Sequence, residues 1–192
     1  RVRRFLVLIA LGALFHKSAV LLLPIAALAS SRNRFLTAGL VGATFVLLYW
    51  LLLAEDADAL WTNYVEAQMY SQGAKIRVLM NAIPAALMLV WGKRLAPDPQ
   101  ERKLWTWIAL VALLCLPIVS LATTAVDRVA LYLIPIQIFV FSRIPRLAGG
   151  NIRVRTLLVL GVIAYYAAVL FVWLNFATHA QYWLPYQFRP FV

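Results

Sequence analysis

The chain has 192 residues, of which 64% are hydrophobic and only 13% are charged. Soluble domains carry about a quarter charged residues, so this composition excludes an ordinary soluble domain. Two histidines, one cysteine and seven carboxylates also leave little material for a zinc cluster, a disulfide framework or a calcium loop, and we expect no metal site. The net charge of +11 would suggest nucleic acid in a soluble protein. Here the basic residues flank apolar segments and report membrane topology, so we expect no nucleic-acid partner.

Apolar segments of membrane-spanning length recur along the chain. A hydrocarbon core about 30 Å thick needs about 20 mostly apolar helical residues. The segments that meet or approach this length are 35–53, 78–92, 104–121, 129–142 and 156–174. The first apolar segment, 5–29, differs because His16 and Lys17 lie at its middle and Pro24 interrupts its second half. We predict an all-α polytopic membrane protein with about five full spans plus an N-terminal half-helix hairpin or re-entrant segment.

Segment 5–29 is either one span or a hairpin of two half-length helices, and the positions of the basic residues distinguish these two possibilities. If it is a hairpin, the basic clusters within 1–4, 32–34, 93–103 and 143–155 all lie on one side, which the positive-inside rule makes cytoplasmic. A single span would move the first cluster outside, so the charges favour the hairpin. The external edge then carries Arg77, Asp127 and Arg128. We predict one transmembrane domain over residues 1–192 and, because the chain begins with Arg1 rather than Met, the C-terminal part of a longer protein.

His16 and Lys17 are the first candidates for chemistry, because apolar runs flank them on both sides. Ionisable residues at membrane depth are costly and normally face a cavity or a partner. A half-helix that starts near Ser18 would direct its N-terminal amides at an anion such as phosphate. The alternative is a hairpin tip whose polar side chains simply reach interfacial water.

A second group of candidates lies at the external edge. Tyr132 falls one helical turn after Arg128, so the two side chains can line one pocket. A guanidinium binds phosphate or carboxylate through two hydrogen bonds, and Asp127 would hold that arginine or accept a proton. Alternatively, Asp127 caps a helix and Arg128 is an interfacial anchor. Arg77 offers a second cationic site, for which ordinary headgroup contact is the alternative.

Three short motifs resemble those of a known family. The stretch 14–24, Leu-Phe-His-Lys-Ser-Ala-Val-Leu-Leu-Leu-Pro, resembles the "FHxSA…P" segment of the EpsG-type membrane proteins of exopolysaccharide gene clusters. Arg128 followed by Tyr132 is similar to the arginine-tyrosine helix of that family. Pro185-Tyr186 is similar to its C-terminal "YPY" segment. Family members have additional N-terminal spans, which agrees with a C-terminal portion.

The resemblance implies a Wzy-like polymerase of the bacterial cytoplasmic membrane, which joins oligosaccharide repeat units carried on polyprenyl diphosphate at the outer face. It matches His16, Arg128, Tyr132 and Tyr186 to family positions. Arg77 and Asp127 are added from their depth and charge. The expected partners are the polyprenyl-diphosphate-linked oligosaccharide, membrane lipid and other polysaccharide-assembly proteins, and no cofactor is expected.

The implied chemistry assigns roles to these residues. No nucleotide is available for glycosyl transfer at the external face, so departure of the polyprenyl diphosphate must drive the reaction. Cationic residues must then stabilise the negative charge that the leaving diphosphate gains. Arg128, Arg77 and Lys17 are the expected substrate-binding cations. His16 is the expected base, with Asp127 in reserve.

Other functions fit the same residues. A lipid-linked sugar flippase or transporter would bind the diphosphate through cationic residues and helices interrupted by proline, and would catalyse no reaction. A membrane acyltransferase that modifies polysaccharide would use the intramembrane histidine. In a structural subunit of an assembly complex, the polar residues would only satisfy packing.

Overall fold

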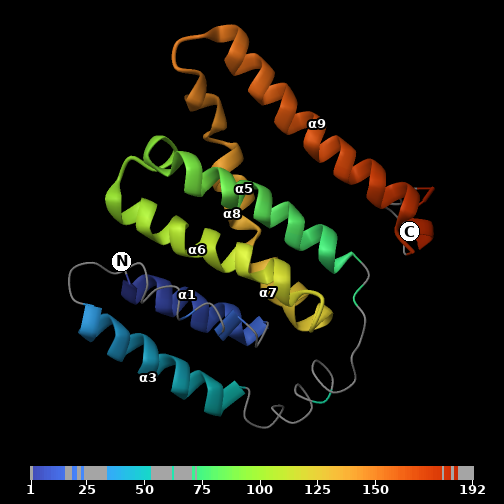
Figure 1. Cartoon of the computed structure of the whole chain (residues 1–192). Helices are drawn as coiled ribbons and strands as arrows, with labels where there is room; N and C mark the ends of the chain where they lie inside the picture. Colours follow the sequence, from blue (N-terminus) through green and yellow to red (C-terminus); the bar gives the residue numbers. More distant parts are fainter. Residues whose placement is uncertain are drawn as a thin grey trace, which may run out of the picture. The chain divides into compact units, whose positions relative to one another are not determined.

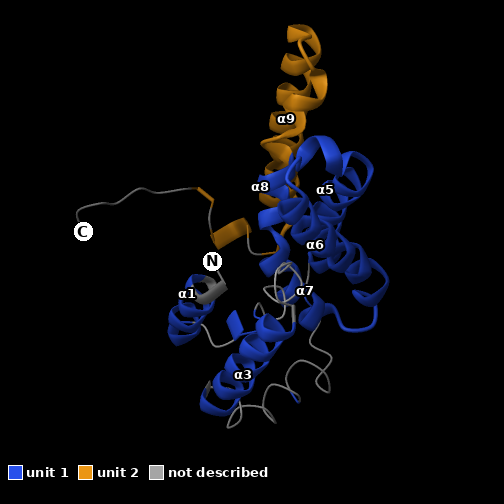
Figure 2. Ribbon diagram, turned by 90° about the vertical axis from the view of Figure 1, so that its left-hand side faces the viewer, with its two compact units in different colours: residues 1–140 blue, residues 141–192 orange. Residues whose placement is uncertain are grey.

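The computed structural model describes residues 2–15, 19–20, 23, 34–52, 62, 71, 73–178, 180–182 and 184–185. All regular structure within these ranges is helical, which confirms the predicted all-α class (Figure 1). The chain divides into two compact units, residues 1–140 and residues 141–192 (Figure 2).

Helices α1 (Val2–Phe15) and α3 (Arg34–Leu52) lie side by side. They share a small apolar core, which consists of Leu6, Ala13, Val20, Leu23 and Val41. α3 agrees with the predicted segment 35–53. α1 covers the first half of the predicted segment 5–29, and most of the second half lies outside the described residues. The choice between one span and a hairpin therefore stays a prediction.

Helices α5 (Ala74–Leu95) and α6 (Pro99–Ile118) form an antiparallel hairpin, because a short connection joins them. Asp98 caps α6: its carboxylate accepts a hydrogen bond from the N–H of Glu101 at 2.8 Å. Pro99 suits the first helical position, where an N–H would have no partner inside the helix. The Arg102 guanidinium donates back to the carbonyl oxygen of Ala96 at 3.3 Å, which ties α6 to the end of α5.

Small residues line the facing surfaces of this hairpin. Ala109, Ala112 and Cys115 are the buried residues of α6, spaced three apart on one face. α5 buries Ala82 and Ala85 among its larger core residues. Small side chains allow helix backbones to approach closely, which is the usual way that helices associate where burial from water does not drive them together.

Helices α7 (Thr123–Leu133) and α8 (Pro135–Phe141) are parts of one bent rod, and α7 packs against α5 and α6. The axis bends by 42° between α7 and the segment 135–148. Pro135 lacks an N–H and its ring collides with the preceding turn, which favours a kink or break at this point. The predicted segment 129–142 lies within this bent pair, whose first helix begins earlier, at Thr123, and breaks at Ile134.

In the second unit, the 3-10 helix η3 (Ile144–Ala148) precedes α9 (Ile152–Phe176), and the 3-10 turn η4 (Ala180–Tyr182) follows it. Gly149 turns the chain with φ 58°, a backbone conformation that glycine adopts without cost. The side chain of Asn151 caps α9 by accepting the N–H groups of Arg153 and Val154 at 3.0 and 3.2 Å. No residue of α9, all of which is described, is buried.

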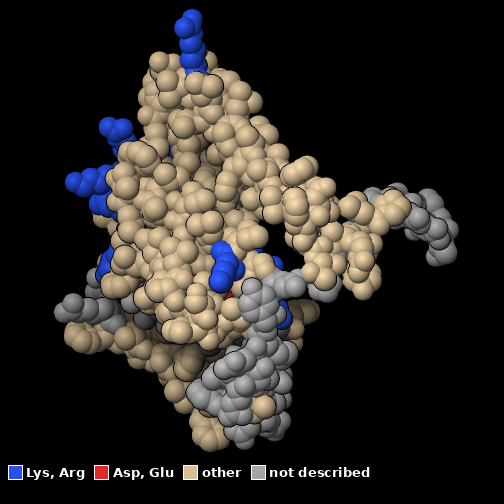
Figure 3. Space-filling view, turned by 45° about the vertical axis from the view of Figure 1, so that its right-hand side comes forward, with Lys and Arg blue, Asp and Glu red and all other residues tan. Residues whose placement is uncertain are grey.

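Two helices, α5 and α9, are long and apolar enough to cross a bilayer, and the bent pair of α7 with 135–148 is a third candidate. The described parts of α1 and α3 give shorter apolar helices, and α6 carries Glu101, Arg102 and Lys103 in its first turns. The residues described thus support two to three spans, and five full spans stay a prediction. Most of the face in Figure 3 carries neither acidic nor basic side chains.

Candidate functional site

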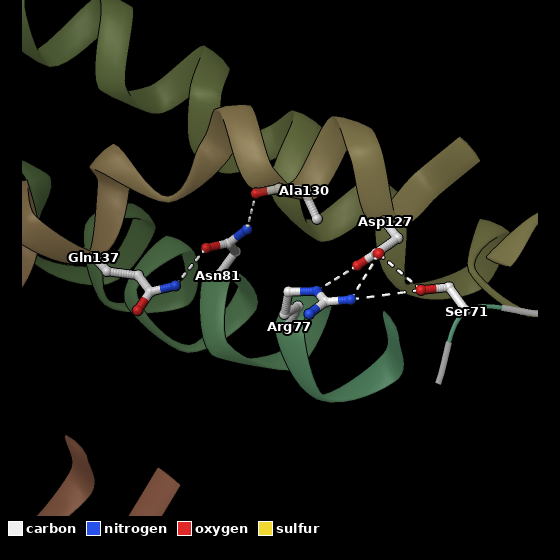
Figure 4. A network of polar contacts seen from close by, with 6 residues as sticks. All are labelled: Ser71, Arg77, Asn81, Asp127, Ala130 and Gln137. Carbon is white, nitrogen blue, oxygen red and sulfur yellow. Dashed lines mark hydrogen bonds and ion pairs between the residues drawn. The ribbon is translucent and has the colours of Figure 1, made fainter. Parts of the chain in front are cut away.

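An arginine–aspartate pair joins the first turn of α5 to α7 (Figure 4). Nε of Arg77 donates to Oδ1 of Asp127 at 2.5 Å, and Nη2 donates to Oδ2 at 2.7 Å. The Ser71 hydroxyl, from the segment before α5, donates to Oδ2 at 2.8 Å. The pair is therefore bidentate, the geometry in which an arginine–carboxylate contact is strongest and best oriented.

The backbone at the start of α5 places Arg77 there. Gly73, which immediately precedes the helix, has φ 82°, a left-handed conformation that glycine adopts readily and other residues rarely do. The Gly73 carbonyl accepts a hydrogen bond from the N–H of Arg77 at 3.0 Å, which places Arg77 in the first turn of α5. Without a side-chain cap, this end of α5 depends on glycine for its entry angle.

Burial differs sharply between the two partners. The side chain of Asp127 is 6% exposed, whereas that of Arg77 is 40% exposed. A buried carboxylate without a partner is costly, so Arg77 and Ser71 make the position of Asp127 tolerable. The outer edge of the guanidinium remains accessible. Among the residues that the structure describes, none accepts a hydrogen bond from Nη1 of Arg77.

A second polar contact lies one turn further along α5 and explains how the α7–α8 break is tolerated. In a regular helix the carbonyl of Ala130 would accept the N–H of Ile134, but that N–H donates to Leu131 at 3.4 Å. The amide of buried Asn81 donates to the freed Ala130 carbonyl at 2.7 Å. Nε2 of Gln137, beyond the break, donates to Oδ1 of Asn81 at 2.7 Å. One asparagine thus bridges both sides of the bend, in place of the water that an apolar bundle lacks.

Of the seven predicted site residues, the structure brings Arg77 and Asp127 into contact. Arg128 follows Asp127 on α7 and is exposed, and Tyr132 is half-buried one turn later. The remaining three, His16, Lys17 and Tyr186, lie outside the described residues.

Two local expectations for α7 need correction. Asp127 does not cap the helix, because α7 begins at Thr123 after Ala122, and the Asp127 carboxylate bonds across to α5. Its bidentate partner is Arg77 rather than the neighbouring Arg128. Residues adjacent in a helix point in different directions, and the inward-facing carboxylate of Asp127 contacts its cation on α5.

Sequence reasoning missed Ser71 and Asn81 as members of this network. Asn81 carries a usable signal: it stands in an apolar helix four residues after Arg77, about one helical turn, so both side chains share a face. Ser71 has no such signal, because nothing in the sequence relates a loop serine to a residue 56 positions later. Within the described residues, no three His, Cys, Asp or Glu side chains come together, and we assign no metal ligands there.

Comparison with known proteins supplies the family. The model of the EpsG family matches residues 1–188. The chain belongs to the EpsG family. No curated protein and no solved structure matches the chain. The EpsG match includes all seven predicted site residues, from His16 to Tyr186, together with Ser71 and Asn81.

Proposed function

We propose that this EpsG-family chain belongs to a membrane polysaccharide polymerase that joins oligosaccharide repeat units carried on polyprenyl diphosphate at the outer face of the bacterial cytoplasmic membrane. The family match over residues 1–188 carries the proposal, because membership of the EpsG family suggests a polysaccharide polymerase-like membrane protein. The structure adds a physical reason. A half-exposed arginine is fixed at one end of an apolar helical bundle, where a lipid diphosphate would present its charge.

The charge at that end of the bundle supports an anionic substrate. Lys75 and Arg77 lie in the first turn of α5, and Arg128 lies on α7 beside Asp127. Among the described residues of α7 and of the first turn of α5, three cations thus stand against one carboxylate. Fixed cationic groups at the place where negative charge develops need no rearrangement during the reaction, and such groups often contribute more to catalysis than any other single effect.

The opposite end of α5 supports the membrane orientation. Lys93 and Arg94 lie in its last turn, and Arg102 and Lys103 follow at the start of α6. At 1.5 Å per residue, Arg77 and Lys93 are about 24 Å apart along the helix, close to the thickness of a hydrocarbon core. The basic turn between α5 and α6 would then be cytoplasmic and Arg77 external.

The reaction has a definite balance of bonds. The hydroxyl oxygen of an acceptor sugar forms a bond to the anomeric carbon of the growing chain, while the bond from that carbon to the diphosphate oxygen breaks. The polyprenyl diphosphate leaves with the electron pair, where Arg77 and Arg128 stabilise it. His16 is the proposed base that takes the hydroxyl proton, Lys17 a further cation, and Tyr132 and Tyr186 are proposed to contact the substrate.

The test uses the full-length protein in a host that lacks it. Arg128→Ala and His16→Ala are expressed, and three quantities are measured: polymer length, lipid-linked repeat unit on each side of the membrane, and protein abundance. We expect long polymer to be lost while intact repeat units accumulate outside. Arg94→Ala is the matched control, because it removes an exposed arginine at the opposite end of the bundle and should leave polymer length unchanged.

Other results of this test discriminate the alternatives. Repeat units trapped on the cytoplasmic side would indicate a flippase or transporter. Full-length polymer that lacks acyl groups would indicate an acyltransferase. Normal polymer from both variants would contradict the proposed site and indicate a structural subunit of an assembly complex.

A further inference from the structure

The contacts that Arg77 makes with described residues use one edge of its guanidinium and leave the other edge without a partner among them. Nε and Nη2 are the donors to Asp127, and Nη2 also lies 3.5 Å from the hydroxyl oxygen of Ser71. An arginine has five N–H donors, two of them on Nη1. The group is planar and rigid, so two bonds along the Nε–Nη2 edge fix the direction of the Nη1 edge.

The contacts of Asp127 leave it little capacity for a second task. Oδ1 accepts Nε of Arg77, and Oδ2 accepts both Nη2 and the hydroxyl of Ser71. A general base needs an oxygen within hydrogen-bond reach of the proton that it removes. Asp127 is 6% exposed, and both of its oxygens are already occupied. The Asp127 carboxylate therefore acts as a hydrogen-bond acceptor for Arg77.

We propose that Asp127 and Ser71 are positioning residues which hold the guanidinium of Arg77 so that its Nη1 edge donates to a phosphate oxygen of the substrate diphosphate. This inference rests on the proposed function for the identity of the diphosphate. It assigns Asp127 to orientation, in place of the proton-accepting role that its charge alone suggests. Neither Asp127 nor Ser71 touches the phosphate, and both act through Arg77.

Binding of inorganic pyrophosphate to the purified full-length protein tests this arrangement without requiring polymerisation. We expect Asp127→Asn to weaken pyrophosphate binding about tenfold, because the neutral amide has a single acceptor oxygen, so one hydrogen bond to Arg77 is lost and the other is no longer charge-assisted. Ser71→Ala removes a single neutral contact and should weaken it about threefold. The two substitutions remove no group that contacts the anion. Loss of the Asp127 charge would by itself strengthen anion binding, so weaker binding points to a disturbed Arg77.

A double-mutant cycle separates positioning from every other role. Arg77→Lys keeps the positive charge, but an ammonium group cannot donate two parallel hydrogen bonds to a carboxylate and has no second edge that faces a phosphate. In that background, Asp127→Asn should weaken pyrophosphate binding by less than about twofold, because the group that it positions is gone. Asp98→Asn is the matched control: it neutralises a carboxylate at the far end of α5 and keeps a residue type that caps helices well. Thermal unfolding of each variant is recorded in the same buffer, and Ser71→Ala carries the test if Asp127→Asn does not fold.

Two results would overturn the inference. One is wild-type pyrophosphate affinity in both Asp127→Asn and Ser71→Ala. The other is an equal loss from Asp127→Asn with and without Arg77. Failure of the proposed function looks different: pyrophosphate binding would follow the expected pattern, yet polymer in the host would not depend on Arg77.

Discussion

Helices α5 and α9 both meet the length and composition of a membrane span, but they differ in what they contact. α5 buries nine residues and contributes two side chains, Arg77 and Asn81, to hydrogen bonds with α7. α9 is the more apolar of the two and buries none of its 25 residues. The difference teaches that apolarity locates candidate spans, whereas polar residues inside an apolar helix locate the contacts that define a site.

The loss of Arg77 should have the largest effect on stability. Arg77→Ala leaves the Asp127 carboxylate buried without its cation, and we expect the free energy of unfolding to fall by about 2–3 kcal/mol. This is below the full cost of breaking a buried pair because Arg77 is 40% exposed. Thermal or denaturant unfolding in detergent measures the change.

The companion substitution tests the physical reason for that loss. Arg77→Ala combined with Asp127→Ala removes both charges, so it should be more stable than Arg77→Ala alone. Lys75→Ala, an exposed cation two residues away, is the control and should change stability by less than about 0.5 kcal/mol. A double variant less stable than the single one would mean that Asp127 is held by something other than Arg77.

Two asparagines allow the same substitution to be compared in α5 and in α9. Asn81→Leu leaves the Ala130 carbonyl without a donor inside the bundle, so we expect a loss of about 1–3 kcal/mol. Asn175 donates its amide to Phe171 within its own helix and is exposed, so Asn175→Leu should cost under about 0.5 kcal/mol. Equal effects would contradict the conclusion that α5, unlike α9, supports another helix through its polar side chains.

The all-helical class was predictable because helix formation depends on local pattern. The extents of α3 and α9 follow from apolar runs of the right length. Helix α6 begins at Pro99, before the predicted segment 104–121, because Asp98 caps a polar first turn that an apolar run does not include. The break at Pro135 was missed. An apolar run gives no sign of where a helix bends, and proline within it is compatible with either a kink or an end.

The site was predictable only in its parts. Arg77 and Asp127 were both selected by depth and charge, yet their contact was not, because it joins residues 50 positions apart. Which cation a carboxylate contacts depends on how α7 is rotated against α5, and that rotation is set by packing of side chains such as Ala130 and Leu133. Sequence periodicity indicates which residues share one face of a helix, but it does not indicate which residues of another helix that face contacts.

Capping of α6 gives a smaller expected effect. Asp98→Ala removes the acceptor for the Glu101 N–H, and we expect a loss of about 1 kcal/mol. Asp98→Asn should restore most of it, since asparagine caps equally well. Hydrogen exchange of the α6 first turn, compared with that of the Asn151-capped turn of α9, checks that the loss is local.

The smallest expected effect tests the apolar surface of α9. Leu160 is 53% exposed, so Leu160→Ala should change the free energy of unfolding by under about 0.5 kcal/mol in detergent. Met88→Ala in α5, at a side chain 1% exposed, should cost about 2–5 kcal/mol in the same assay. Both substitutions shorten a long apolar side chain to the same methyl group, so burial is the main difference between them. A cost at Leu160 that approached the cost at Met88 would mean that α9 is covered by protein, and its apolarity would then reflect helix packing rather than contact with lipid.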